Sequence, residues 1–324
     1  MEKDFQLLNN IYMGSLLVAL NVVLPMFGLM LIGYIAKATG LFDDKTLKQL
    51  NRFVFSALIS TSLYKSISSS SFKESINIMV LIVTFLGFAL SICIGYFLAK
   101  KMAKQRNQIP VIWQGVFRGN NVLYGMALVQ FLYNTPSIPV VAGLLAITAP
   151  LVNIGCVLIF SIFTGDKPDP KKFILSVVKN PLIIACVLAF ITMGFKIQLP
   201  SFVNTIISQL SSAANPLGLV VLGASFKFEK VADNIKAILS VAIVRNFIIP
   251  FITVSLAVMC GLKGGALTAI VSMFCVPTAL SSFAMAASLG GDSDLAGQIV
   301  MVTTLISIFT IFFFIFGLDS LGLL

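Results

Sequence analysis

Long apolar segments separated by short polar loops occupy most of this 324-residue chain. A helix needs about 20 apolar residues to cross the hydrocarbon core of a membrane, and the segments have about this length. Because that core contains no water to bond backbone groups, such a segment satisfies its own hydrogen bonds as a helix. Charged residues make up only 10% of the chain, too few to cover a water-soluble domain. We therefore expect an all-α integral membrane protein.

Ten segments are long and apolar enough to be predicted as transmembrane helices. They cover residues 11–38, 46–67, 76–100, 109–133, 139–164, 173–194, 200–225, 235–260, 264–289 and 294–318. The second is the weakest, because Ser56, Ser60, Thr61 and Ser62 lower its apolar character. It is retained because the basic residues distribute consistently only with an even number of spans.

The lysines and arginines predict the orientation of the helices. With the N-terminus outside, the cytoplasmic loops within 37–52, 100–106, 167–172 and 227–236 hold fourteen of the 22 basic residues, and the outer loops hold five. Basic residues concentrate on the cytoplasmic side of membrane proteins. We therefore expect a multi-pass protein of the cell membrane with both termini outside.

The most polar break in the chain, at residues 164–172, lies almost at its midpoint and leaves five segments on each side. Because five is odd, two similarly folded halves would have opposite orientations in the membrane. Inverted repeats of this kind are common among secondary transporters. We predict a first five-helix repeat over 1–167 and a second over 168–324.

Composition excludes several other classes of function. The net charge of +10 comes from loops rather than from a patch interleaved with aromatic residues, so it predicts contact with anionic lipid and no nucleic-acid partner. The chain has no histidine, and its five cysteines lie in apolar runs without a CxxC pair. No metal, cofactor or enzymatic activity is expected. No Asp or Glu lies in the middle of a segment, which argues against a proton-exchanging carboxylate and favours an anionic ligand.

The fourth segment carries Arg118, Gly119, Asn120 and Asn121 near its middle. An arginine there costs roughly 2.5–3.5 kcal/mol on insertion scales, which is tolerable where it lines a wet cavity. Glycine and asparagine also weaken a helix and free its backbone groups. A broken helix would present N–H groups to a ligand. The alternative is a cluster of hydrogen bonds that only holds the helices together.

The ninth segment contains Pro277 in its middle, followed by Thr278, Ser281 and Ser282. Proline removes a helix hydrogen bond and bends or breaks the helix. The fourth and ninth segments occupy equivalent positions in the two halves, and paired interrupted helices indicate a transport site. We predict that Arg118, Asn120, Asn121, Pro277, Thr278 and Ser281 bind a ligand.

Two further polar positions are structural candidates. Asn215 and Pro216 in the seventh segment fit the start of a helix, and the glycines that follow them favour close helix packing. Arg245 in the eighth segment could meet a carboxylate of the ligand or bond backbone carbonyls. The residues leave both roles for Arg245 open.

Short motifs resemble the auxin efflux carrier family. They are Gly119-Asn120 followed by Gly125, Pro277-Thr278-Ala279 followed by Gly290-Gly291-Asp292, and the run 215–226. That family includes plant auxin exporters and bacterial permeases for malate or malonate, and it is related to the bile-acid carriers. The chain departs from the family pattern at Val122, where a glycine is usual, and at Ala127, where the crossover proline is usual.

The resemblance implies a homodimer of ten-helix subunits. Helices one, two, six and seven would form a scaffold, and helices three to five and eight to ten a transport domain. Helices four and nine would cross as broken helices, with Asn120, Gly125, Pro277 and Thr278 as the residues carried over from the family. The expected function is a secondary transporter for a small mono- or dicarboxylate, such as malate or an auxin-like acid. The alternative is a sodium-coupled symporter of the bile-acid type.

The orientation can be tested with single cysteines in a variant that lacks the five native ones. Because the basic loops are predicted to be cytoplasmic, cysteines near Ser69 and Asn134 should react with an impermeant reagent added outside. Cysteines near Lys101 and Lys230 should react only from the cytoplasmic side. The reverse labelling pattern would contradict the predicted topology.

Overall fold

The computed structural model describes residues 24–68, 77–125, 128–129, 138–164, 178–227 and 231–324. Within these ranges the chain is helical, with short loops and one isolated antiparallel bridge between Gly119 and Thr278. The prediction of an all-α fold is confirmed for these residues. Parts of the first, fourth and sixth predicted segments lie outside them.

Every predicted segment has a helix, or a pair of helices, in its described part. The first half contains the helix Leu24–Ala38, α2 (Asp44–Phe53), a π-helical turn (Val54–Ile59), α3 (Ser60–Ser68), α4 (Ile78–Met102), α5 (Ile109–Phe117), a second π-helical turn (Asn121–Gly125) and α7 (Ile138–Thr164). The second contains α9 (Pro181–Gly194), α10 (Ser201–Ser225), α11 (Val231–Ile243), a third π-helical turn (Val244–Ile248), α12 (Ile249–Met259), α13 (Gly264–Phe274), α14 (Ser281–Ser288) and α15 (Ser293–Ser320).

Five helices of the described chain are long and apolar enough to cross a membrane. They are α4, the part of α7 from 143 onward, α10, the continuous helix from α11 through α12, and α15. Three more apolar helices, Leu24–Ala38, α9 and α13, are shorter. The full count of ten spans and the inverted repeat stay predictions.

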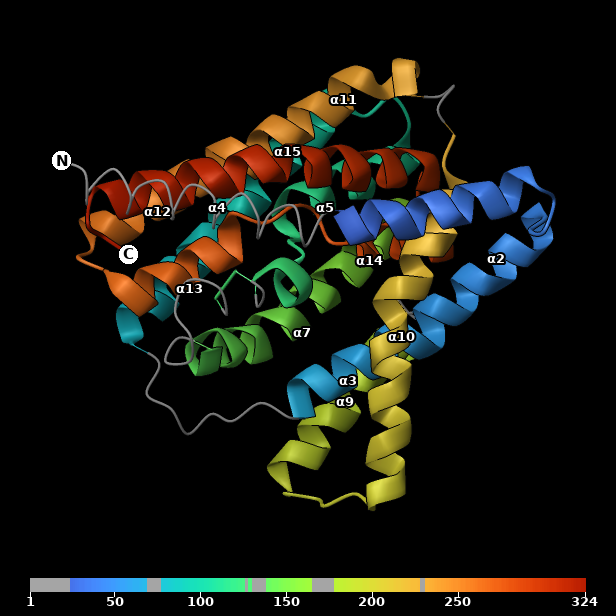
Figure 1. Ribbon diagram of the computed structural model, residues 1–324, viewed down its shortest axis with the longest axis horizontal. Coiled ribbons are helices and arrows are strands. Elements are labelled where there is room, and N and C mark those ends of the chain that lie inside the picture. The colour runs from blue at the N-terminus through green and yellow to red at the C-terminus, as the bar shows by residue number, and fades with distance from the viewer. Residues whose placement is uncertain (1–23, 69–76, 126–127, 130–137, 165–177, 228–230) are drawn as a thin grey trace, which may run out of the picture.

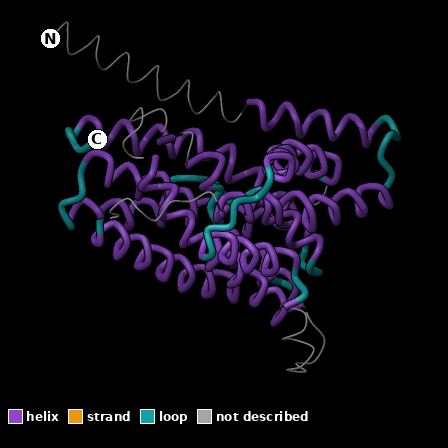
Figure 2. The backbone as a smooth tube through the Cα atoms, turned by 90° about the horizontal axis from the view of Figure 1, so that it is seen from below, coloured by secondary structure: helices purple, strands orange, loops and turns teal. Residues whose placement is uncertain are grey.

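The helices form two groups that lie side by side (Figure 1). In one group α3 packs against α9 and α10, and α10 also contacts α2. In the other, α4 packs against α5, α12 and α13, and α15 packs against α11 and α14. Figure 2 shows that non-helical stretches also lie in the interior of the molecule, away from the ends of the long helices.

Loops that the basic residues assign to the cytoplasmic side contact one another. Lys104 Nζ donates to the carbonyl of Asp233, and the carboxylate of Asp294 lies 4.0 Å from Lys227 Nζ. Arg106 Nη2 donates to the carbonyl of Ile162 at 2.9 Å. These contacts join two of the four basic loops, 100–106 and 227–236, to each other, and connect them to the end of α7 and the start of α15. The side of the membrane that these loops face stays a prediction.

Two glycines bring the helix Leu24–Ala38 into backbone contact with α10. A Cβ atom on Gly33 would lie 2.0 Å from the carbonyl oxygen of Val220, and one on Gly223 would lie 1.9 Å from that of Met30. Neither position can hold a larger side chain unless the helices separate. The glycines of the seventh segment therefore include a helix-packing residue, as its sequence predicts.

Gly33→Ala should destabilise the protein, because overpacking a tight contact typically costs 1–3 kcal/mol. Gly28→Ala on the same helix is the matched control, since a Cβ there meets no atom within 4 Å. Melting temperatures in detergent should fall for Gly33→Ala and stay unchanged or rise for Gly28→Ala. Equal melting temperatures for the two variants would contradict the close packing of these helices.

Candidate functional site

Two helices are interrupted in the interior of the molecule. α5 ends at Phe117, and a non-helical stretch over 118–120 leads to the π-helical turn 121–125. α13 ends at Phe274, and residues 275–280 lead to α14. Pro277 explains the second break, because it has no N–H to donate to a helix. The first break forms even though Val122 stands where a glycine is usual in the family and Ala127 where the crossover proline is usual.

The two non-helical stretches cross and bond to each other. Gly119 and Thr278 form the antiparallel bridge. On its two sides Asn120 N donates to Pro277 O at 2.8 Å, and Ala279 N donates to Arg118 O at 3.0 Å. Glycine at position 119 lets Arg245 approach the crossing closely, because a Cβ there would lie 2.0 Å from Arg245 Nη2. These backbone bonds fix the crossing point of the two interrupted helices.

Each interrupted helix caps the carboxyl end of the other. Thr278 Oγ1 donates to the carbonyl of Gly115 in α5 at 2.7 Å. Asn121 Nδ2 donates to the carbonyl of Met273 in α13 at 2.7 Å. The last four carbonyls of a helix have no partner within it, and leaving them unbonded in an apolar interior is costly. Thr278 and Asn121 therefore each supply one of the hydrogen bonds that the carboxyl ends of α5 and α13 need.

Arg245 bonds the backbone on both sides of the crossing. Its Nε donates to Val276 O at 2.9 Å and its Nη1 donates to Val116 O at 3.2 Å, and the side chain is 0% exposed. Of the two roles open from the sequence, the structure shows the bond to carbonyls. Arg245 lies in the π-helical turn 244–248, which directly precedes α12 and its Pro250. Pro250 cannot donate to the carbonyl four residues earlier, which accounts for the irregular turn.

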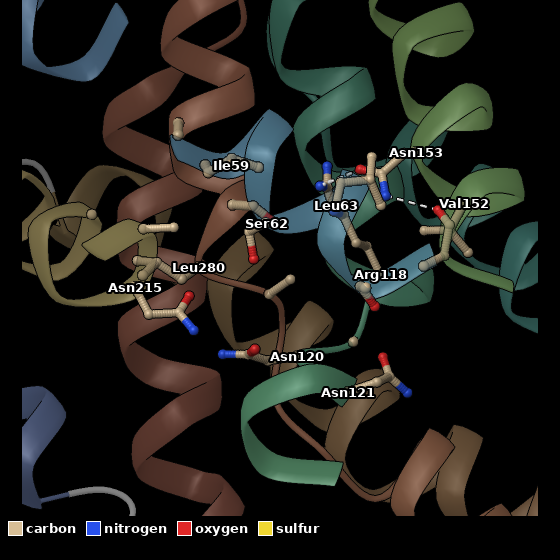
Figure 3. Close-up of a pocket in the computed structure, with 18 of the residues that line it drawn as sticks. Ile59, Ser62, Leu63, Arg118, Asn120, Asn121, Val152, Asn153, Asn215 and Leu280 are labelled. Atoms are coloured by element: carbon tan, nitrogen blue, oxygen red, sulfur yellow. Dashed lines mark hydrogen bonds between the residues drawn. The ribbon is translucent and has the colours of Figure 1, made fainter. Parts of the chain in front are cut away.

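A cavity of about 130 Å³ lies beside the crossing, between the two groups of helices (Figure 3). Its walls come from the helix that contains α2 and α3, from α4, α7, α10 and α14, and from the crossing itself. Four of the six predicted ligand-binding residues line it, namely Arg118, Asn120, Asn121 and Ser281. Pro277 and Thr278 lie in the crossing and do not line it.

Among the described residues that line the cavity, Arg118 is the charged one, and none of them is acidic. The guanidinium is 4% exposed and donates from Nη2 to Asn153 Oδ1 at 2.7 Å and from Nη1 to Met285 Sδ at 3.0 Å. Both partners are neutral. A buried positive charge without a carboxylate partner is electrostatically uncompensated, so the cavity favours an anion.

Two asparagine side chains add hydrogen-bonding groups to the lining. Asn120 and Asn215 both point into the space between them in Figure 3, and neither amide has a hydrogen-bond partner among the described residues. The amide groups are therefore free to bond a ligand. Asn215 and Pro216 lie inside α10, so the prediction that they mark the start of a helix is wrong. The structure gives Asn215 a place in the cavity wall instead.

Gly125 has a packing role, and two residues of α7 add to the cavity wall. A Cβ on Gly125 would lie 2.6 Å from the carbonyl oxygen of Ser272, so this glycine lets the π-helical turn approach α13. Sequence reasoning missed Thr148 and Asn153 on α7, which line the cavity. The signal was present as two polar residues flanking Pro150 in an apolar run. No group of His, Cys, Asp or Glu suited to a metal ion occurs among the described residues.

The chain is similar to a family model and to several known proteins. A family model described as membrane transport protein matches residues 18–165 and 169–315. An uncharacterized transporter of Methanocaldococcus jannaschii is 24% identical over 314 residues, covering 91% of this chain and 97% of the relative. A protein of Rhizobium meliloti named "Putative malonate transporter" is 23% identical over 312 residues, covering 90% and 93%.

A third relative, an uncharacterized transporter of Methanothermobacter thermautotrophicus, is 24% identical over 317 residues, which cover 92% of this chain and 96% of the relative. All three similarities extend over nearly the whole length of both proteins. The family match also covers most of the chain, and it is interrupted in the polar loop at its midpoint. The chain belongs to the membrane transport protein family, the auxin efflux carrier family that its motifs resemble.

Proposed function

We propose that this protein is a secondary transporter that carries a small organic anion across the cell membrane by alternating access. The observation that carries the proposal is the position of Arg118. Its buried charge faces a cavity at the crossing of two interrupted helices and has only neutral partners. Paired interrupted helices of this kind form the substrate sites of many secondary transporters.

The lining suits a carboxylate. The planar guanidinium of Arg118 can donate two parallel hydrogen bonds to carboxylate oxygens. The amides of Asn120 and Asn215 can donate further bonds, which a carboxylate needs after it loses its water. α14 begins at Ser281 in the cavity wall, so its N-terminus adds positive potential.

The size of the cavity supports a small ligand. A single water occupies about 10–15 Å³ of such a volume, so a cavity of about 130 Å³ holds on the order of ten waters or a ligand of similar size. A mono- or dicarboxylate of a few carbon atoms meets this limit. The relative named for malonate, a dicarboxylate, supports this class of substrate.

The cavity walls support alternating access. Val54, Ser62 and Asn215 belong to the helices that the family assigns to the scaffold, whereas Arg118 and Asn120 belong to the transport domain. A ligand bound between them would be carried across when one domain moves against the other. The family resemblance implies that two such subunits form a homodimer.

Binding of a panel of carboxylates to the purified protein tests the function. We expect saturable binding of one or more of them, and a ten- to hundredfold weaker affinity in Arg118→Gln, because a hydrogen bond to a charged partner contributes roughly 1.5–3 kcal/mol. Arg106→Gln is the control, since Arg106 is exposed and bonds the carbonyl of Ile162. Wild-type affinity in a folded Arg118→Gln protein would contradict the proposed site.

Asn120 and Asn121 should separate binding from stability. Asn120→Leu removes free amide donors from the cavity, so affinity should fall about ten- to hundredfold with a nearly unchanged melting temperature. Asn121→Leu removes the cap on Met273 O, so the melting temperature should fall. Both quantities are measured on the same purified proteins. Unchanged affinity with a lower melting temperature for Asn120→Leu would remove Asn120 from the site.

A further inference from the structure

The backbone carbonyls at the two breaks are the groups that a coupling cation would need. In transporters with interrupted helices, unwound carbonyls and the carboxyl ends of half-helices coordinate the sodium ion. Here such carbonyls include those of Gly115 and Val116 in α5, Met273 in α13, and Val276 and Pro277 in the stretch after α13. Sodium coupling would require several of these oxygens to converge on one ion.

The protein itself bonds each of these oxygens. Thr278 Oγ1 donates to Gly115 O and Asn121 Nδ2 to Met273 O, both at 2.7 Å. Asn120 N donates to Pro277 O at 2.8 Å. The other two carbonyls, one from each interrupted helix, bond the single guanidinium of Arg245. Each of these five oxygens therefore already accepts a hydrogen bond from the protein.

The guanidinium of Arg245 lies between carbonyls of the two interrupted helices. The side chain is 0% exposed, and its third nitrogen, Nη2, has no hydrogen-bond partner among the described residues. That nitrogen lies 2.0 Å from the place where a Cβ on Gly119 would be, so it faces the crossing from the side of the carboxyl ends. A guanidinium stays protonated in proteins, and its positive charge complements the negative ends of the two helices.

We infer that Arg245 is the resident cation of the crossing: it occupies the carbonyl site of a coupling sodium ion, so this carrier works without one. Arg245 acts as a positioning residue, because it holds the two breaks together and does not line the ligand cavity. The consequence for coupling rests on the proposed transport function. The inference that Arg245 occupies the site does not depend on that function.

The first test uses the wild-type protein without substrate. Melting temperatures are compared in sodium chloride and in N-methylglucamine chloride at equal ionic strength. A bound ion stabilises the folded state by mass action, so a sodium site would raise the melting temperature as sodium increases. We expect the same melting temperature in both salts. A rise that saturates with sodium concentration would overturn the inference.

The second test removes the cation. Arg245→Ala should lower the melting temperature by roughly 5 °C or more, because it leaves two buried carbonyls unbonded. Guanidinium chloride at low millimolar concentration, or sodium chloride, should restore part of this loss in Arg245→Ala and none in wild type. Arg106→Ala, the exposed matched control, should show neither the loss nor the recovery.

A purely packing role makes a different prediction for the variants. Arg245→Lys keeps the charge with a smaller head group, so it should be more stable than Arg245→Gln and insensitive to sodium. Arg245→Gln being at least as stable as Arg245→Lys, or Arg245→Ala showing no recovery with either cation, would overturn the inference. If Arg245→Ala does not fold, the lysine and glutamine variants and the wild-type salt comparison decide.

The outcomes also separate this inference from the proposed function. Absence of carboxylate binding would contradict the proposed function, while the melting temperatures would still test the resident cation. Carboxylate binding that requires sodium in wild type would support an anion carrier and overturn the role of Arg245. Binding with an affinity that changes less than about twofold between the two salts is the expected result.

Discussion

The hydrogen bonding of the broken backbone is the constraint on which the rest of this structure depends. A helix that stops in an apolar interior leaves carbonyls and N–H groups without partners, and each unbonded group costs several kcal/mol in hydrocarbon. Here each interrupted helix receives hydrogen bonds from residues of the other. Thr278 bonds the end of α5, Asn121 bonds the end of α13, and the Gly119–Thr278 bridge joins the stretches between.

The two buried arginines near the crossing have different surroundings. Arg245 lies on the side of the carboxyl ends, where its guanidinium is bonded to Val276 O and Val116 O. Arg118 lies on the cavity side, where its partners Asn153 and Met285 are neutral. The first charge holds the crossing together, and the second is available to an anion. The free amides of Asn120 and Asn215 flank the same space (Figure 3).

The lengths of the apolar segments and the positions of glycine and proline within them predict much of this fold. The segments could be located because hydrocarbon thickness sets their length, and Pro277 marks the ninth-segment break because it cannot donate. The positions of Arg118 and Asn120 were predictable from the cost of burying them. The first break forms despite the family departures at Val122 and Ala127, and the bridge between Gly119 and Thr278 joins it to the second break.

Contacts between distant segments could not be predicted in the same way. Asn153 stands near Pro150 as a polar residue in an apolar run, but its local sequence does not show that it reaches Arg118 on another helix. Asn215 precedes a proline, which locally indicates a helix start, but it lies within α10 because the surrounding contacts hold that helix together. The role of Arg245 depends on carbonyls contributed by two other segments.

The most direct measurement is the location of a bound anion in an experimental structure. A brominated malonate diffused into crystals of the protein can be found by the anomalous signal of bromine. We expect a peak in the cavity, within hydrogen-bonding reach of Arg118 and of the amides of Asn120 and Asn215. A peak outside this cavity, for a ligand that the same protein binds in solution, would contradict the claim that the crossing forms the anion site.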